Sequence, residues 1–234
     1  MTTVPLAIAL PASAEFEALH ALLNARTSCR AFLDQCVSRE VIERILGAAQ
    51  RTASWCNAQP WQVHIVQGEP LERLRSGMYA MRDTPPAPDL DWPREYRGVY
   101  QERRRACGWG LYEAVGIAKG DRVASATQAA ENMRMFGAPH VAIVSSDEAL
   151  GTYGAVDCGA YVSNFMLAAC SLGVGCVAQA ALASQARVLR EHLGIGSDRL
   201  IVCGVSFGYP DTTHPANGWR TTRAPTTDSA VWVE

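Results

Sequence analysis

The chain has 234 residues, of which 48% are hydrophobic and 19% are charged. This length and composition are typical of a folded protein with room for one large domain or two small ones, and they exclude a disordered, collagen-like or coiled-coil chain. The formal net charge is −2, so no excess of positive charge indicates a nucleic-acid or anionic membrane partner. The cations are uneven in type, because Lys119 is the single lysine among 21 basic residues.

The eight cysteines are scattered along the chain and include no C-x-x-C pair. Several lie in apolar surroundings, as Cys170 and Cys203 do, where cysteine behaves as a small buried hydrophobe. Neither the cysteines nor the five histidines have the spacing of a metal site. We therefore expect reduced thiols, a cytoplasmic protein and no bound metal.

Two apolar stretches need to be weighed as targeting or membrane segments. Residues 1–15 lack the positive charge that opens a secretion signal, and two prolines bracket their apolar run. Residues 158–186 carry no charge and are long enough to span a bilayer, but Gly173 and Gly175 interrupt them. We expect a fully buried helix followed by a buried loop. A helix covered on all sides in so small a chain favours a partner subunit.

Taken in chain order, the sequence predicts many helices and few strands. A helix over 15–26 precedes a second helix that begins after Ser38, a good N-cap residue. Alternating side chains then predict a strand over 61–67, and four prolines make residues 84–93 a loop. The other expected elements are helices over 69–81, 95–117, 121–136, 153–172 and 184–193, and strands over 139–145 and 199–207.

Because the strands are few and separated by long helical segments, the expected fold class is α+β with a small sheet. No boundary in composition divides the chain into two cores. We expect a single domain over residues 1–234, with a lid-like insertion at about 84–136 and an extended C-terminal tail at about 209–234.

Two short motifs match known sites without their structural context. Residues 204–208 fit G-x-S-x-G with Ser206 as nucleophile, but the following Tyr-Pro-Asp cannot begin the helix that this motif requires. Residues 173–178 fit the dinucleotide fingerprint, but they follow a helix where a strand is needed, so Gly173 is expected to end that helix. A serine hydrolase acting through Ser206 remains an alternative of another class.

Two other segments point to a more specific chemistry. Residues 26–30 (Arg-Thr-Ser-Cys-Arg) place two cations and two hydroxyls directly after a helix, and guanidinium groups with hydroxyls suit a phosphate. Residues 52–61 (TASWCNAQPW) place side-chain amides and two tryptophans between a helix and a strand. Amides offer paired donors and acceptors, which suit the edge of a planar heterocycle, although a plain surface turn and an ordinary loop remain alternatives.

Together these segments resemble the opening of the FMN-dependent nitroreductase family, whose usual pattern is R-x-S-x-R-x-F followed by P-S-x-x-N-x-Q-P-W. Details such as Ser-Trp-Cys-Asn at 54–57 and the run PANGWRTTR at 215–223 resemble its nitrobenzoate-reductase-like branch. Further blocks follow in family order: FGAP at 136–139, LAA at 167–169, LGVG at 172–175, LREHLGI at 189–195, GVSFGYP at 204–210 and RTTRAP at 220–225.

The resemblance implies which residues bind FMN. In the family the R-x-S-x-R segment and the arginine before the final proline hold the phosphate and ribityl chain, while the N-x-Q-P-W loop and the loop after the central helix approach the ring. Ala53 replaces the family's proline, and Arg220 is a candidate substitute for a lysine that some members carry at the position of Thr221. The implied FMN-binding residues are Arg26, Thr27, Ser28, Arg30, Ser54, Asn57, Gln59, Gln179, Ala180 and Arg223.

The resemblance also implies a small, mostly antiparallel sheet flanked by helices, in an intertwined homodimer. The implied reaction is a ping-pong transfer: NADH or NADPH reduces FMN, and hydride then passes to an aromatic nitro compound, through nitroso to hydroxylamine. Quinones and enones are alternative acceptors. Because the flavin carries the chemistry, no side chain is assigned as catalytic. Aromatic residues of the insertion are candidates for a substrate lid or for packing, namely Trp92, Tyr96, Tyr100, Trp109 and Tyr112.

Overall fold

The structure is a computed structural model and describes residues 13–234. The expectation that residues 1–15 contain no secretion signal concerns a stretch that lies almost entirely outside this range.

A four-stranded antiparallel sheet in the order β1-β2-β4-β3 forms the centre of the fold. The strand bounds are β1 Gln62–Gln67, β2 His140–Asp147, β3 Gly175–Gln179 and β4 Arg199–Gly208. Successive residues of β2 enter different cores: Ala142 and Val144 pack on one face of the sheet, and Val141 and Ile143 pack on the other. The expected α+β fold with a small antiparallel sheet is confirmed.

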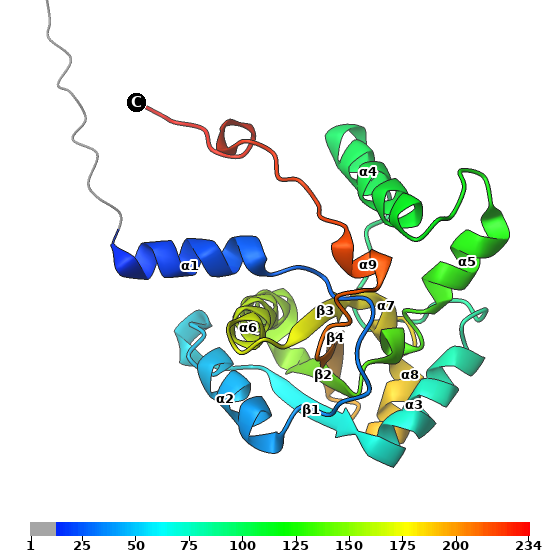
Figure 1. Ribbon diagram of the computed structural model, residues 1–234. Helices are drawn as coiled ribbons and strands as arrows, with labels where there is room; N and C mark the ends of the chain where they lie inside the picture. The colour runs from blue at the N-terminus through cyan, green and yellow to red at the C-terminus, as the bar shows by residue number, and fades with distance from the viewer. Residues whose placement is uncertain (1–12) are drawn as a thin grey trace, which may run out of the picture.

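Helices cover both faces of this sheet (Figure 1). The apolar spacing in the second helix has the predicted effect, because Ile42, Ile45 and Ala49 are buried in the core that this helix shares with the sheet. Ser38 caps that helix, with its Oγ accepting from the Val41 N–H at 3.3 Å. One face carries α2 (Arg39–Ala49) and α6 (Gly151–Ser171), and the other carries α3 (Gly68–Ala80), α7 (Ala180–Ala183) and α8 (Ala186–Leu193).

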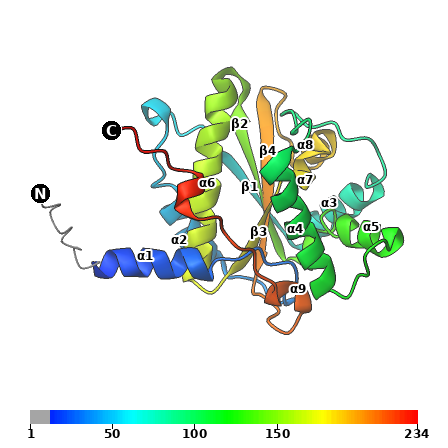
Figure 2. The same ribbon diagram turned by 90° about the horizontal axis from the view of Figure 1, so that it is seen from above.

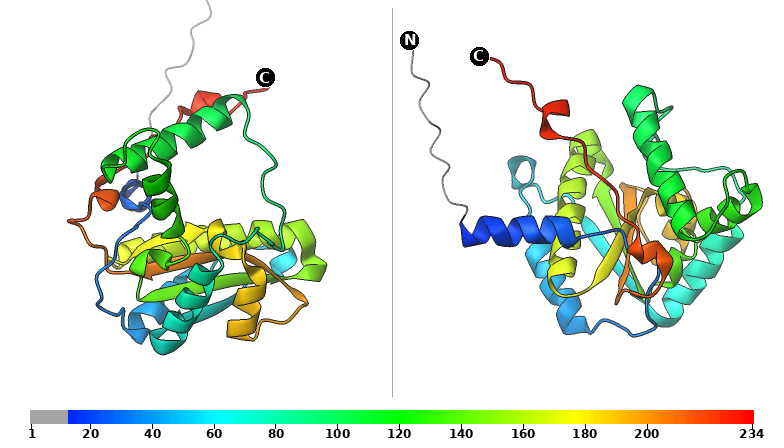
Figure 3. Two further views of the ribbon diagram at one scale, coloured as in Figure 1. Left: turned by 90° about the vertical axis from the view of Figure 1, so that its right-hand side faces the viewer. Right: turned by 45° about the horizontal axis from the view of Figure 1, so that its top comes forward.

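The remaining helices lie at the periphery. Helix α1 (Ala14–Ala25) has no buried residue and extends away from the sheet (Figure 2). Helices α4 (Gly98–Ala114) and α5 (Arg122–Ala130) belong to the expected insertion and stand off from the sheet (Figure 3). The short helix α9 (Pro215–Gly218) contacts α4 and is followed by the C-terminal segment. Single 3₁₀ turns occur at Trp55–Asn57, Met135–Gly137, Glu148–Leu150 and Thr226–Asp228.

The long helix α6, which carries Asp157 as its single charged residue, is buried on one side only. Cys158 and Phe165 are buried against the sheet, whereas Tyr153 and Val156 are each 59% exposed. The expectation of a fully buried helix is therefore wrong for the single chain, which leaves one apolar face of α6 uncovered. No helix within residues 13–234 is both long and apolar enough to cross a membrane.

Two expected boundaries also differ from the structure. Residues 175–179 form strand β3 instead of a buried loop, and Gly175 allows this close packing, since a Cβ there would lie 2.9 Å from the Cys29 Sγ. The helix expected over 121–136 ends at Ala130, because the chain then turns and enters the left-handed region at Met135 and Phe136.

Candidate functional site

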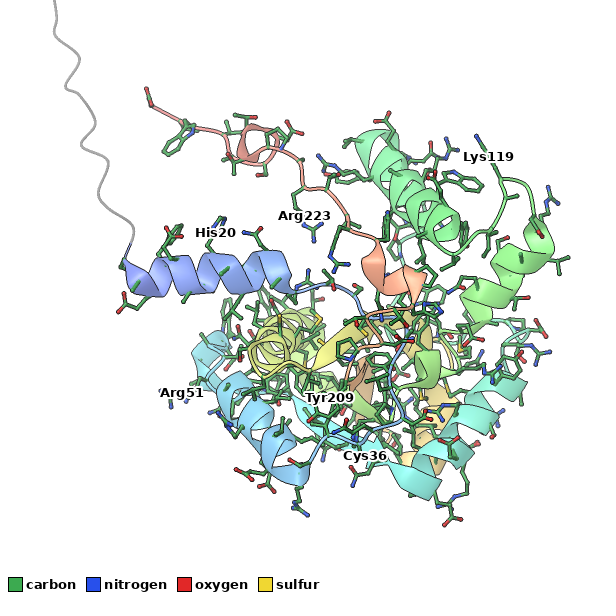
Figure 4. The ribbon with its side chains drawn as sticks, in the orientation of Figure 1. His20, Cys36, Arg51, Lys119, Tyr209 and Arg223 are labelled. Carbon is green, nitrogen blue, oxygen red and sulfur yellow. The ribbon has the colours of Figure 1, made fainter. Side chains whose placement is uncertain are left out.

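A cavity of about 350 Å³ lies where α1 ends and the C-terminal segment passes helix α4. We call it the arginine cavity. Figure 4 shows Arg223 on the C-terminal segment between α1 and α4, and it shows Lys119 on the far side of α4. The polar lining residues are Asn24, Arg26, Thr27, Ser28, Arg30, Arg220, Thr221 and Arg223, and Leu23, Cys107 and Trp219 complete the wall.

The segment after α1 is held in an extended form by the sheet edge. Arg26 leaves the helix with φ −64° and ψ 121°. Ser28 then forms a parallel bridge with Cys176 of β3, and the Cys29 N–H donates to the Cys176 carbonyl at 3.0 Å. Strand β3 thus positions part of the site, because it fixes the segment from which Arg26 and Arg30 project.

The cavity concentrates positive charge that no nearby carboxylate of the described residues neutralises. Within residues 13–234, none of its four arginines forms an ion pair with a carboxylate. Burial lowers the pKa of the half-buried Arg30 guanidinium, which donates to the Ser28 carbonyl at 3.3 Å. Arg223 donates only to the Thr221 Oγ1 and the Thr222 carbonyl. Guanidinium groups without a carboxylate partner, placed beside hydroxyls, have the chemistry that suits a phosphate-like anion.

The loop predicted to face a heterocycle is strained and exposed. Cys56, Asn57 and Gln59 all have φ near +50°, a conformation that residues other than glycine rarely adopt. The Ser54 Oγ accepts from the Gln59 N–H at 2.9 Å, and the Trp55 N–H donates to Asp157 at 3.0 Å. These bonds fix the backbone of the loop. The Gln59 amide is itself bound within the chain, because its Oε1 accepts from the Gln50 Nε2 at 2.9 Å and its Nε2 donates to the Asn57 carbonyl at 3.3 Å.

Within one chain this loop does not meet the arginine cavity. Asp157, which binds the loop, lies near the start of α6, whereas Cys170 near its end lines a second cavity that shares Arg26 with the first. These two positions on the helix are about 20 Å apart at 1.5 Å per residue. The structure therefore brings together Arg26, Thr27, Ser28, Arg30 and Arg223, and it leaves Ser54, Asn57 and Gln59 at the opposite end of α6.

Gln179 lies at the far end of β3 from Cys176, and its side chain points into the protein. Its Nε2 donates to the Asn132 carbonyl at 3.0 Å, and its Oε1 accepts from the Ser206 hydroxyl at 2.5 Å. Only 3% of Gln179 is exposed, whereas Ala180 lies at the surface. The backbone around Ala180, and not the Gln179 amide, is therefore the part that is open to a ligand.

The hydrogen bond from Ser206 to Gln179 also argues against a serine hydrolase. Ser206 is fully buried inside β4 and is committed to Gln179, so it cannot meet a substrate. It also lies within a strand, whereas a nucleophile elbow places its serine on a turn between a strand and a helix. A serine hydrolase acting through Ser206 is excluded on this geometry.

Comparison with known proteins decides the family. The sequence model of the nitroreductase family matches residues 23–209. These residues include the segment after α1, the 52–61 loop and the four strands of the sheet. The chain belongs to the nitroreductase family. As a nitroreductase it is 34% identical to "Nitroreductase NfnB" of Mycolicibacterium smegmatis over 89% of each chain. It is 33% identical to a 4-nitrobenzoate reductase of Nocardioides sp. over 93% of this chain and 90% of that one.

The fold of this nitroreductase is also found among solved structures. The FMN-dependent nitroreductase NfnB from Mycobacterium smegmatis, solved in complex with NADPH, matches it with a TM-score of 0.88 and 31% identity. The match covers 93% of this chain and 99% of that one.

Sequence reasoning overlooked several residues of the arginine cavity in this nitroreductase. Cys107 and Trp219 form its wall, and Asn217 binds the backbone beside Arg30. The sequence indicates Arg220 only as a substitute for the lysine that some family members carry at the position of Thr221. The structure places Arg220 in the cavity. Asn217 could have been noticed in the run PANGWRTTR, but its contact with Arg30 spans 187 positions and follows no local pattern.

Proposed function

We propose that this nitroreductase is an FMN-dependent enzyme that transfers hydride from NADPH or NADH to an aromatic nitro compound. The arginine cavity carries this proposal, because four unpaired guanidinium groups and three hydroxyls line one small space. Two relatives that are 33–34% identical to this chain, a nitroreductase and a 4-nitrobenzoate reductase, support the acceptor class. The likeness to a structure described as FMN-dependent and bound to NADPH supports the cofactors.

The residues present fit the phosphate end of FMN. Arg26, Arg30, Arg220 and Arg223 supply positive charge, and the hydroxyls of Thr27, Ser28 and Thr221 supply neutral donors. A phosphate dianion satisfies several guanidinium groups at once, which relieves their mutual repulsion. When bound, FMN supplies the hydride chemistry, and this chain positions it and excludes water.

We further propose that the working enzyme is a homodimer with Ser54, Asn57 and Gln59 completing the site of the partner subunit. The loop that carries these residues contacts the start of α6, whereas the arginine cavity of the same chain lies near the end of that helix. The uncovered face of α6 and the exposed Phe16, Leu19 and Leu23 of α1 supply the apolar surface that a second copy would cover.

The insertion at 84–136 is proposed to act as a lid. Its base is anchored, because Asp89 forms a two-point ion pair with Arg190 at 2.8–2.9 Å and also accepts from the Ile201 N–H. Trp109 packs edge-on against Tyr112, with a centroid distance of 6.0 Å, so these two aromatics serve packing. Tyr100 is 66% exposed and is the better candidate for contact with a flat substrate.

The state of the cysteines supports a reducing compartment for this enzyme. All eight cysteines are free, and burial raises the pKa of Cys176 and of Cys203 to about 12, which keeps both thiols protonated and unreactive. We propose the cytoplasm as its location.

The test is an acceptor panel with FMN-loaded protein. Steady-state reduction of 4-nitrobenzoate, nitrobenzene, a quinone and an enone would be measured with NADPH and with NADH. We expect the highest kcat/KM with a nitroaromatic. Turnover restricted to quinones or enones would replace the acceptor in this proposal, and absence of turnover with all four acceptors would overturn it.

A further inference from the structure

Asn217 of the short helix α9 connects two parts of the chain that both line the arginine cavity. Its Oδ1 accepts from the Arg30 N–H at 2.7 Å, and its Nδ2 donates to the Ala31 carbonyl at 2.8 Å. The same Nδ2 donates to the Asp211 carbonyl at 2.8 Å. The side-chain amide thus uses one acceptor and both donors at once, which is nearly its full capacity.

The backbone of Asn217 acts on the other side of the cavity. Its carbonyl accepts from the Arg220 guanidinium at 2.5 Å, so one residue fixes the main chain at Arg30 and the side chain of Arg220. Asn217 also lines the neighbouring cavity with Arg26 and Thr27. It therefore lies between the arginines that precede Phe32 and the arginines that follow Trp219.

Other contacts already join these two segments. The Asp211 N–H donates to the Ala31 carbonyl at 3.1 Å, the Leu33 N–H donates to the Tyr209 carbonyl at 2.9 Å, and Phe32 forms an antiparallel bridge with Pro210. The segments would consequently stay together without the Asn217 side chain. What that side chain adds is a hydrogen bond to the Arg30 N–H, made by the same residue whose backbone carbonyl accepts from Arg220.

We propose that Asn217 is a positioning residue that sets the spacing of the arginines around the flavin phosphate. This inference rests on the proposed function, because it assumes that FMN occupies the arginine cavity. Guanidinium groups bind a phosphate well only when their donors reach its oxygens together, so a small displacement of Arg30 or Arg220 weakens several hydrogen bonds at once.

Riboflavin gives a readout that a merely structural role would not move, because it has the ring and ribityl chain of FMN without the phosphate. Dissociation constants of the apoprotein for FMN and for riboflavin would be measured by flavin fluorescence. We expect Asn217→Ala to weaken FMN binding by about tenfold or more while riboflavin affinity changes by less than about twofold. Equal losses for both flavins, or no loss for either, would overturn the proposal.

Ser38→Ala is the matched control for stability, because it removes a helix cap of α2 that touches no residue of the cavity. It should leave the ratio of FMN affinity to riboflavin affinity unchanged. If the Asn217→Ala protein does not fold, Asn217→Gln keeps the amide and displaces it by one methylene. This variant should lower the same ratio, and an unchanged ratio would overturn the proposal.

Arg26→Ala and Arg223→Ala separate failure of this inference from failure of the proposed function. If these variants leave the flavin ratio unchanged, FMN phosphate does not occupy the arginine cavity and the proposed site is wrong. If they lower the ratio and the Asn217 variants do not, the site stands and only the role of Asn217 is wrong.

Discussion

At the scale of single residues, Arg223 differs from most other exposed arginines because it lines a cavity. Arg51 is also an exposed arginine, but it lies on the outer side of the molecule, away from the cavity that Arg223 enters (Figure 4). Most of the twenty arginines lie at the surface, and several pair with neighbours on the same helix, as Arg39 does with Glu43. The preference for arginine over lysine gains chemical meaning only where several guanidinium groups face one cavity.

Arg223→Ala is expected to weaken FMN binding by about 1.5–3 kcal/mol, since a hydrogen bond to a charged group contributes about that much. Isothermal titration of the apoprotein with FMN measures the change. Arg51→Ala removes the same charge from the outer surface and should have no effect on affinity. Equal losses in both variants would mean that only the net charge matters and would contradict a specific contact.

Buried His140 makes stability depend on pH. Its Nε2 accepts from the Val37 N–H at 2.9 Å, so this nitrogen must be unprotonated, and burial lowers the pKa of the imidazole. The unfolded chain, with a histidine pKa of about 6.5, therefore binds the proton more readily. The contribution of neutral His140 to the free energy of unfolding is fully present above about pH 6.5. It is lost as the pH falls through the lowered pKa of the folded protein.

Urea unfolding between pH 7.5 and 5.5 tests this expectation. The free energy of unfolding should fall toward the acid end, and His140→Gln should flatten that dependence. His64, whose pKa burial also lowers, contributes in the same direction, so some slope will remain. His20→Gln changes an exposed histidine on α1 and serves as the control. A wild-type stability that stays constant over this range would contradict the account.

At the scale of elements, helix α4 is positioned by a glycine. A Cβ on Gly110 would lie 2.4 Å from the Trp219 Nε1, so the indole beside Arg220 packs directly on the α4 backbone. Gly108 is on the same helix and has open space where its Cβ would be. Substitutions at these two glycines therefore test how helix α4 is held in place.

Gly108→Ala is expected to raise stability by about 0.5–1 kcal/mol, because alanine is the better helix former. Gly110→Ala has the same intrinsic gain but must displace Trp219, so its stability should be lower than that of Gly108→Ala and its tryptophan emission should shift. Thermal unfolding and fluorescence measure both effects. Identical behaviour of the two variants would show that the contact between α4 and Trp219 is absent in solution.

The elements also show what sequence can and cannot predict here. The amphipathic pattern of α2 and the apolar run of β2 identify these elements because local spacing dictates their burial. Strand β3 was missed because five residues that begin with glycine have no clear period, and pairing with β4 decides their conformation. The residue types at 26–30 suggest a phosphate and leave a plain surface turn open, whereas the role of Asn217 depends on a contact that only the folded chain creates.

At the scale of the whole molecule, the single chain leaves apolar side chains of two helices exposed to solvent. Phe16, Leu19 and Leu23 recur at helical spacing along α1 and are each about half exposed. Tyr153 and Val156 add to this uncovered apolar surface on α6. Exposed apolar side chains on two neighbouring helices are typical of a subunit interface.

Leu19→Glu should therefore disrupt the proposed dimer and give a monomer, because a carboxylate buried in an apolar interface is strongly unfavourable. Light scattering after size-exclusion chromatography would give the mass in each case, compared with 25.3 kDa for one chain. Ala21→Glu places the same charge on the opposite side of α1 and should stay dimeric. A wild-type mass equal to one chain would contradict the proposed interface.

The central claim, that this chain is an FMN-dependent nitroreductase, is tested most directly by an anaerobic titration. Purified protein loaded with FMN would be followed at about 450 nm, where oxidised flavin absorbs. We expect that NADPH or NADH bleaches this absorbance and that 4-nitrobenzoate then restores it. Failure of the protein to retain FMN, or a bleached flavin that no nitroaromatic reoxidises, would contradict the account.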